Sequence, residues 1–268
     1  MNRRTRLFFL IVGLVAVLPC LATKQNVELA AIKEKIESNL AKLRYCEFVL
    51  SKNELIDGKW KYGKSKVKND VLNGQTEIRT IEPRADILVY FPIGKQQDAH
   101  IKLDFFPYIS SDFSPYNALL LRDQHHPISH VNQTYFGKLI LSFINACAGH
   151  KAQYEINYYQ EKHQVEVDLQ PIENPLETKK LKSDISLIQL ADSLCVNPYL
   201  LSESNNNLAY HHQFKKGDLV KTHQYYADRA KILFLEDNFV PLSIVFYYKN
   251  EPFEEYRFSE FKATFNEE

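Results

Sequence analysis

The sequence lacks the motifs by which catalytic sites are most readily found. It has only eight glycines, and none belongs to a phosphate-cradling loop or to a Gly-x-Ser-x-Gly nucleophile turn. A His-Glu-x-x-His zinc motif is also missing. We therefore expect a protein that is not an enzyme. The alternative is an enzyme whose residues come together from distant strands and leave no local motif.

The sequence also has no excess of positive charge. Lysine and arginine number 33, as do aspartate and glutamate, so no attraction to a phosphate backbone is expected and nucleic acid is not a predicted partner. Beyond the first residues, no uncharged apolar stretch approaches the about 20 residues that a transmembrane helix needs. The chain after its leader is therefore expected to fold in water without a transmembrane segment.

The first residues have the three parts of a secretory signal peptide. Arg3, Arg4 and Arg6 precede an apolar run over 7–18, and small residues follow, with a cleavage site after Ala22. One alternative is an uncleaved membrane anchor, for which the run is too short. The other is lipidation of Cys20, which the preceding proline disfavours. We predict that 1–22 is removed and that the remainder is exported to the periplasm or outer cell envelope.

Three cysteines remain after the predicted cleavage. Cys46, Cys147 and Cys195 lie too far apart for a zinc ribbon or a thioredoxin-type pair. In an oxidising compartment two of them could form a disulfide, and the third would then be a small buried apolar side chain. The sequence does not choose the pair.

Apolar periodicity predicts a helix, then strands, then a second helix and further strands. The predicted helices cover 29–43 and 135–147. The predicted strands cover 45–50, 59–68, 76–81, 86–91, 100–106, 153–160, 164–169, 230–235, 242–248 and 253–265. Short strands at close spacing indicate antiparallel pairing. We predict an α+β fold in which one curved antiparallel sheet, a half-barrel, wraps around the helices.

Residues 171–224 differ in sequence pattern from the predicted strands on either side and are predicted to be an insert. Two short helices are expected over 185–194 and 198–205, the second capped by Asn197 and opened by Pro198. Residues 179–183 are charged and expected to lack regular structure, and a strand is expected over 219–222. The half-barrel is accordingly divided into 23–170, with the N-terminal helix, and the closing strands of 225–268.

A family resemblance of the insert is carried by 186–201, by Asn205 and by the Lys216-Gly217-Asp218 turn before the last strand. With these residues the insert resembles a degenerate LysM module. It departs from the family at 184–186, where the usual glycine-aspartate-threonine entrance is replaced. The resemblance implies a β-α-α-β unit and peptidoglycan as a partner, with Asp184, Asn205, Asn206 and Asn207 as the candidate glycan-binding residues.

A second resemblance is carried by four segments outside the insert: 122–128, 136–139, 240–248 and 254–261. In these segments the chain resembles an uncharacterised family of secreted bacterial proteins that share the fold of the lipoprotein carriers LolA and LolB. It implies an unclosed β-barrel around helices and a carrier or sensor of a hydrophobic ligand, such as a lipoprotein acyl chain. The alternative function is a peptidoglycan-associated interaction protein that acts through the insert.

Aromatic side chains make up 13% of the sequence, and many lie in predicted strands. Trp60, Tyr90, Phe105 and Phe106 are predicted to line an apolar pocket that could take an acyl chain or apolar peptide. The alternative is that these side chains fill the space between the sheet and the helices.

A histidine cluster is the best candidate for a metal site. His125, His126 and His130 are close in sequence, but Pro127 interrupts any helix that would align them, and no carboxylate follows at ligand spacing. We predict no metal and no cofactor, and interpret these histidines as loop residues that hydrogen-bond the following helix. Asn132 is predicted to cap that helix and Cys147 to be buried in it.

Overall fold

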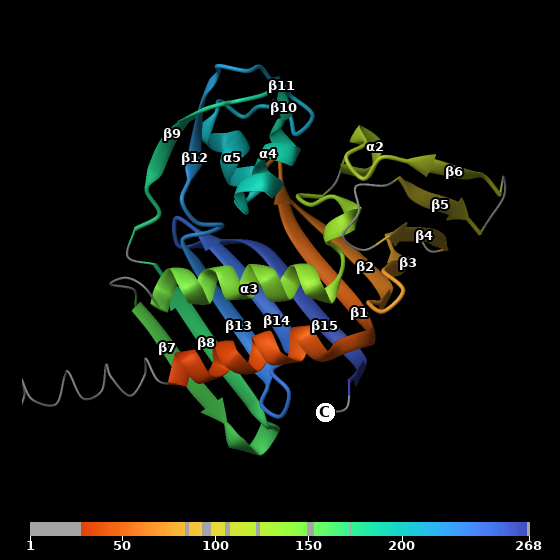
Figure 1. The fold of residues 1–268 in the computed structure, drawn as a ribbon, viewed down its shortest axis with the longest axis vertical. Helices are drawn as coiled ribbons and strands as arrows, with labels where there is room; N and C mark the ends of the chain where they lie inside the picture. Colours follow the sequence, from red (N-terminus) through yellow and green to blue (C-terminus); the bar gives the residue numbers. More distant parts are fainter. Residues whose placement is uncertain are drawn as a thin grey trace, which may run out of the picture.

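The computed structural model describes residues 28–83, 86–92, 98–104, 108–121, 124–148, 153–171 and 173–266. The fold is α+β, as predicted: a curved, open antiparallel sheet carries helices on one face (Figure 1). The predicted leader over 1–22 lies outside the described residues, so export stays a prediction. Phe105 and Phe106 also lie outside them.

Within the described chain, eleven strands form the main sheet, in the order β6-β5-β4-β3-β2-β1-β15-β14-β13-β8-β7. Their bounds are β1 (Leu43–Ile56), β2 (Lys59–Asp70), β3 (Gln75–Glu82), β4 (Ile87–Pro92), β5 (Ala99–Leu103), β6 (Ser110–Phe113), β7 (Gln153–Tyr159), β8 (Gln164–Gln170), β13 (Arg229–Leu235), β14 (Pro241–Tyr248) and β15 (Glu251–Phe265). Because β1 pairs with β15, strands from the two ends of the chain meet in the middle of the sheet.

Local chemistry explains the central hairpin. Asp57 and Gly58 both have positive φ, 49° and 70°, which a tight turn between right-twisted strands requires. The register that follows pairs Ile56 with Lys59. Two register shifts in the β1–β15 pair bend these long strands.

Two helices cover one face of the sheet. The N-terminal helix (28–42) and α3 (Gln133–Ala148) lie across the strands in Figure 1. Their apolar sides are buried against the strands, and the space between sheet and helices is filled; the helix residues in this core include Leu29, Ile32, Ile36, Phe136, Ile140, Phe143 and Ile144. The helices approach each other at Gly137, where an added Cβ would lie 2.5 Å from Leu40 Cδ1.

Residues 176–223 form a small unit at one end of the sheet (Figure 1). It comprises β9 (Leu176–Lys180), β10 (Ile185–Ser186), α4 (Leu187–Leu194), α5 (Pro198–Ser204), β11 (Gln213–Phe214) and β12 (Leu219–His223). These strands pair as β9–β12 and β10–β11, in two sheets separate from the main one. A second apolar core, with Leu187, Leu201 and Val220, supports the unit.

Side chains of this unit cap the N-termini of both of its helices. Asn197 caps α5 by accepting a hydrogen bond from the Tyr199 amide, and Pro198 occupies the first turn, as predicted. Ser186 and Gln189 form a reciprocal capping box on α4. The prediction that 179–183 lacks regular structure is wrong at its start, because Lys179 and Lys180 pair with Val220 and Leu219.

Other short elements were not predicted by residue range. They are strands β6, β9, β10 and β11, helix α2 (Ala118–Leu121) and two 3₁₀ turns, η1 (Ile128–His130) and η2 (Gln160–Lys162).

None of the three described cysteines forms a disulfide. Cys46 and Cys147 are buried on β1 and α3, whereas Cys195, after α4, is exposed. Burial raises the pKa of Cys46 and of Cys147 to about 12, so both are neutral apolar side chains.

Among the described residues, no helix combines the length and the apolar character that a membrane crossing needs.

Replacement of Gly137 by alanine tests the helix contact. Alanine favours a helix interior by about 1 kcal/mol over glycine, but its methyl group would overlap the Leu40 side chain, and overpacking costs about 1–3 kcal/mol. We expect Gly137→Ala to lower the urea midpoint. Combining it with Leu40→Ala should cause less loss than the two single changes added together, because the second change removes the overlap. A Gly137→Ala protein at least as stable as the wild type would contradict this contact.

Candidate functional site

Two buried glutamates face each other at the centre of the sheet. Glu54 on β1 and Glu254 on β15 are direct register partners, and only 1% and 0% of their surfaces are exposed. Strand alternation turns both toward the helix-covered face, because Glu54 is in phase with buried Leu50, and Glu254 with buried Tyr256. Like charges directly opposite each other destabilise a strand pair, and a buried carboxylate needs partners.

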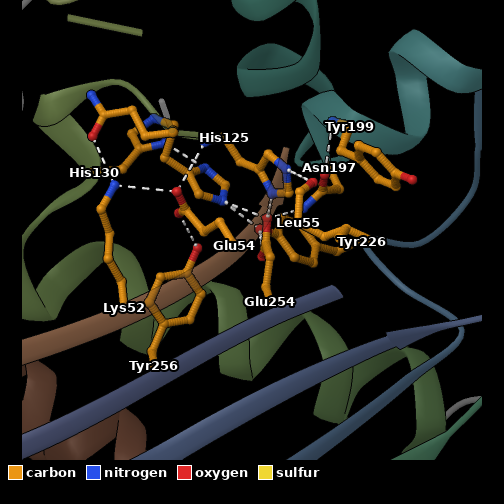
Figure 2. Close-up of polar contacts among 12 residues, drawn as sticks. Lys52, Glu54, Leu55, His125, His130, Asn197, Tyr199, Tyr226, Glu254 and Tyr256 are labelled. Atoms are coloured by element: carbon orange, nitrogen blue, oxygen red, sulfur yellow. Dashed lines mark hydrogen bonds and ion pairs between the residues drawn. The ribbon is translucent and has the colours of Figure 1, made fainter. Parts of the chain in front are cut away.

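Six donors surround the two carboxylates (Figure 2). Glu54 accepts hydrogen bonds from Lys52 Nζ at 3.2 Å, the His125 amide at 3.1 Å and the Tyr256 hydroxyl at 2.8 Å. Glu254 contacts His125 Nδ1 at 2.5 Å, Asn197 Nδ2 at 2.7 Å and the Tyr226 hydroxyl at 2.6 Å. Each of the four carboxylate oxygens therefore has at least one partner.

His125 supplies positive charge to this cluster. Its Nδ1 faces Glu254, and its Nε2 lies 2.9 Å from the Leu55 carbonyl oxygen. Both partners are acceptors when Glu254 is ionised, so both ring nitrogens must carry protons. Burial lowers the pKa of His125, but the hydrogen bond and the charge of Glu254 outweigh it and raise the pKa overall. The ring also stacks on Tyr199, with centroids 5.3 Å apart.

The pKa values of both glutamates are below their ordinary value. Burial raises the pKa of Glu254, but the charge of His126 and the hydrogen bond from His125 overcome this effect and lower it strongly. Burial likewise raises the pKa of Glu54, and the charges of Lys52 and His125 reverse the shift. Both carboxylates are therefore ionised at neutral pH.

A relay of polar side chains leads away from Glu254. The Tyr226 hydroxyl lies 2.5 Å from His126 Nε2, and His126 Nδ1 lies 3.3 Å from His130 Nδ1. His130 Nε2 lies 2.9 Å from Asp192 Oδ1 on α4. We call this chain of contacts, from Glu254 through Tyr226, His126 and His130 to Asp192, the histidine relay.

The contacts fix the direction of the hydrogen bonds at both ends of the relay. Tyr226 donates its only proton to Glu254, so His126 Nε2 must donate to the Tyr226 oxygen. His130 Nε2 donates to Asp192, because a carboxylate oxygen accepts. His126 Nε2 also lies 3.5 Å from Glu254 Oε1. Within the cluster, Lys52 and His125 balance the charges of Glu54 and Glu254.

Glu54, His126 and Glu254 could in principle hold a metal ion. Each offers a ligand atom, and these atoms lie within 4.8 Å of one another. Carboxylate and imidazole donors suit zinc. However, a cation would have to displace the hydrogen bonds described above, and Lys52 and His125 already balance the charges of Glu54 and Glu254. The arrangement therefore gives no reason to place a metal there.

The far end of the relay forms part of the wall of a cavity of about 350 Å³, bounded by α3 and α4. Its apolar lining includes Phe91, Leu139, Ile188, Ala191 and Val196. Its polar lining includes His126, His130, Asp192, Tyr116 and Tyr135. Tyr116 and His130 each contact one oxygen of Asp192 at 2.9 Å. The cavity is thus a mainly apolar space with an ordered polar wall.

The two predicted aromatic residues that the structure describes, Trp60 and Tyr90, do not line this cavity. Trp60 and Tyr90 are each 43% exposed. They alternate with Val67 and Val89, which belong to the core, and so lie on the sheet face turned away from the helices. Tyr90 borders an open groove that also includes Tyr45 and His100. The described residues do not bring Trp60 and Tyr90 together in one cavity.

The predicted glycan-binding residues hold turns of the insert. Asp184 accepts hydrogen bonds from the Lys216 amide at 2.8 Å and from Lys215 Nζ at 3.1 Å. Asn205 pairs with both backbone groups of Lys221, at 3.0 Å and 2.6 Å. Asn206 and Asn207 have positive φ values of 64° and 56°. Glycan binding by these four residues stays a prediction.

The interpretation of the histidines as partners of the following helix is wrong for His125 and His130. Their partners come from β1, β15 and α4, and only His126 contacts α3 by a hydrogen bond, through the Tyr135 hydroxyl at 3.3 Å. The helix is capped instead by Asn132, which accepts from the Tyr135 amide at 2.8 Å, as predicted. Cys147 is buried, also as predicted.

Glu54 and Glu254 were not identified from the sequence as site residues, although one pattern in it indicates Glu54. Cys46, Phe48 and Leu50 alternate on the buried face of β1, and the same alternation continues through Lys52 to Glu54. A charged residue in phase with an apolar strand face indicates a buried ion pair. The partner could not be found this way, because its strand lies at the other end of the chain.

Comparisons with known proteins detect only distant likenesses. No protein-family model matches the chain, and no curated protein sequence matches it. An uncharacterised conserved protein from Thermus thermophilus is 8% identical, with a TM-score of 0.37 over 88% of this chain and 86% of that one. A LolA-superfamily protein from Nitrosomonas europaea is 10% identical, with a TM-score of 0.31 over 88% and 93%.

A third solved structure, of a DUF1329 family protein from Desulfovibrio piger, is 11% identical, with a TM-score of 0.30 over 90% of this chain and 92% of that one. All three scores are below 0.5, so the fold class rests on the strand order and pairing described above. The resemblance of the insert to LysM stays a resemblance of sequence.

Replacement of Glu254 by glutamine tests the buried cluster. Glutamine keeps the shape but removes the charge that His125 requires, and breaking a buried ion pair costs about 3–5 kcal/mol. We expect Glu254→Gln to lower the free energy of unfolding by this amount in urea titrations at pH 7. Glu251→Gln, an exposed position on the same strand, is the matched control and should leave stability unchanged. Equal stability of both variants would show that the cluster is not an ionic network.

The pH dependence of stability follows from the shifted pKa values of the two glutamates and His125. Glu54 and Glu254 have folded-state pKa values below their ordinary 4.5, so their contribution is complete above that pH and is lost as the pH falls through the lowered values. His125 has a raised pKa, so its contribution is complete below its ordinary 6.5 and is lost as the pH rises through the raised value. Urea midpoints measured from about pH 3 to pH 9 should decline on both sides. Glu254→Gln should flatten both slopes, and parallel curves would contradict the pairing.

Proposed function

We propose that this protein is an exported, non-enzymatic binding protein for an apolar ligand, held in the cavity between α3 and α4. The observation that carries the proposal is the cavity itself: about 350 Å³, with aliphatic and aromatic walls and a small set of ordered polar groups. Ligand sites in proteins have this composition and volumes of roughly 300–1,000 Å³.

The position of the cavity supports binding rather than simple packing. The core between the sheet and the two long helices is filled by Phe136, Ile140 and Phe143, so the cavity is not a defect of that core. It lies instead beside α4, and Ile188, Ala191 and Val196 of the insert form one wall. The insert therefore completes the proposed ligand site.

The polar groups support a binding role over a catalytic one. The relay side chains contact one another, and Asp192 has a hydrogen-bond partner on each oxygen. Burial lowers the pKa of His130 and opposes the effect of Asp192. Side chains whose hydrogen-bonding groups already have partners can orient a bound molecule, but they offer no free base for a reaction.

Lipid extraction and probe uptake test the proposal. We expect protein purified without detergent to release a lipid or other apolar molecule that mass spectrometry detects, and the emptied protein to bind a fluorescent fatty-acid probe. Absence of both an extractable ligand and probe uptake would rule out the proposed function.

A cavity-filling variant makes the test specific. Thr134 lies on α3 in the cavity wall, so Thr134→Trp should occupy part of the cavity and weaken probe binding by about tenfold or more. Asn145→Trp, at an exposed position on the same helix, is the control and should bind like the wild type. Equal binding by both tryptophan variants would place the probe elsewhere.

A further inference from the structure

The described lining of the cavity holds more basic than acidic residues. Among these described residues the one acidic residue is Asp192, whose pKa burial raises but the hydrogen bond from His130 lowers, so that it is ionised. The basic residues of the described lining are His126, His130 and Lys138. His130 faces Asp192 at 2.9 Å and His126 faces Glu254 at 3.5 Å, so each histidine has a carboxylate partner.

Lys138 is the third basic residue of the described lining. Thr134, Lys138 and Ser142 follow one another at intervals of four residues and form a stripe along α3 that lines the cavity. Lys138 is the middle member and is exposed. In the described part of the chain no carboxylate forms an ion pair with it. Its ammonium group is thus available to a molecule in the cavity.

We propose that the ligand of the cavity is an anionic amphiphile, an apolar chain with a carboxylate or other acidic head that pairs with Lys138. The proposal rests on the proposed function and adds the class of ligand. The apolar wall formed by Phe91, Leu139 and Ile188 accepts the chain. The head binds at the α3 stripe, where Thr134 and Ser142 add hydroxyl groups on either side of Lys138.

Electrostatics predicts which head groups are rejected. An uncharged head would leave the Lys138 charge without a counterion, and a cationic head would be repelled by the Lys138 ammonium group. Affinity should therefore rank anionic above neutral above cationic for one chain length.

Competition with three molecules of equal chain length tests this ranking. Dodecanoate, dodecanol and dodecylamine are titrated, below their micellar concentrations, against an uncharged environment-sensitive dye bound to the full protein. Dodecanoate should displace the dye at about tenfold lower concentration than dodecanol, because a charge-assisted contact is worth about a factor of ten or more. Dodecylamine should be the weakest competitor.

Variants of Lys138 assign the effect to this residue. Lys138→Gln should bring dodecanoate to the affinity of dodecanol without changing dodecanol itself, and Lys138→Arg should restore the preference. Lys162→Gln, at an exposed turn between β7 and β8, is the control and should bind like the wild type. Unchanged melting temperatures confirm that the variants are folded.

Two results overturn the proposal, and they are distinguishable. If dodecanol binds as tightly as dodecanoate, or if Lys138→Gln changes both affinities equally, the cavity holds an apolar ligand without charge selection. If neither the dye nor any of the three molecules binds, the proposed function itself fails.

Discussion

The structure depends on how two ionised carboxylates are kept out of water at the same point of a sheet. Glu54 and Glu254 would repel each other across the β1–β15 pair. They are stabilised because Lys52 and His125 bring charge, while tyrosine hydroxyls and an asparagine amide fill the remaining acceptor positions. Removing one partner of a buried ion pair is far more destabilising than replacing the whole pair by apolar residues. Each residue of the cluster therefore depends on the others.

The need to provide partners for Glu54 and Glu254 brings segments from distant parts of the chain to the centre of the sheet. The segment that carries His125 bonds the glutamates of both strands and is followed by α3. Asn197 has two roles, because its amide nitrogen bonds Glu254 while its oxygen caps α5. This side chain joins the insert to the main sheet, and the contacts of Asp192 with His130 and Tyr116 hold α4 in place. The cavity lies between α3 and α4, beside these contacts.

Much of the fold could be predicted from the sequence, and little of the site. Strand alternation and turn chemistry are local, so the strands around Asp57-Gly58 and the helix of Phe136 and Phe143 follow from nearby residues. The caps at Asn132 and Asn197 are local too. The site is not local, because His125, Glu54 and Glu254 come from three separate regions of the chain. For the same reason Trp60 and Tyr90 could be assigned to strands, but not to the correct face of the sheet.

The pairing of β1 with β15 also sets an order of events in folding. The contact between Tyr256 and Glu54 spans 202 positions, and such long-range contacts form slowly. Until the residues of β15 have left the ribosome, the half of the sheet that ends in β1 has an open edge and Glu54 has no counterpart. The centre of the sheet is therefore completed only when β15, the last of its strands in chain order, is available to pair. Until then β1 and β14 each leave an open strand edge that could pair with another chain.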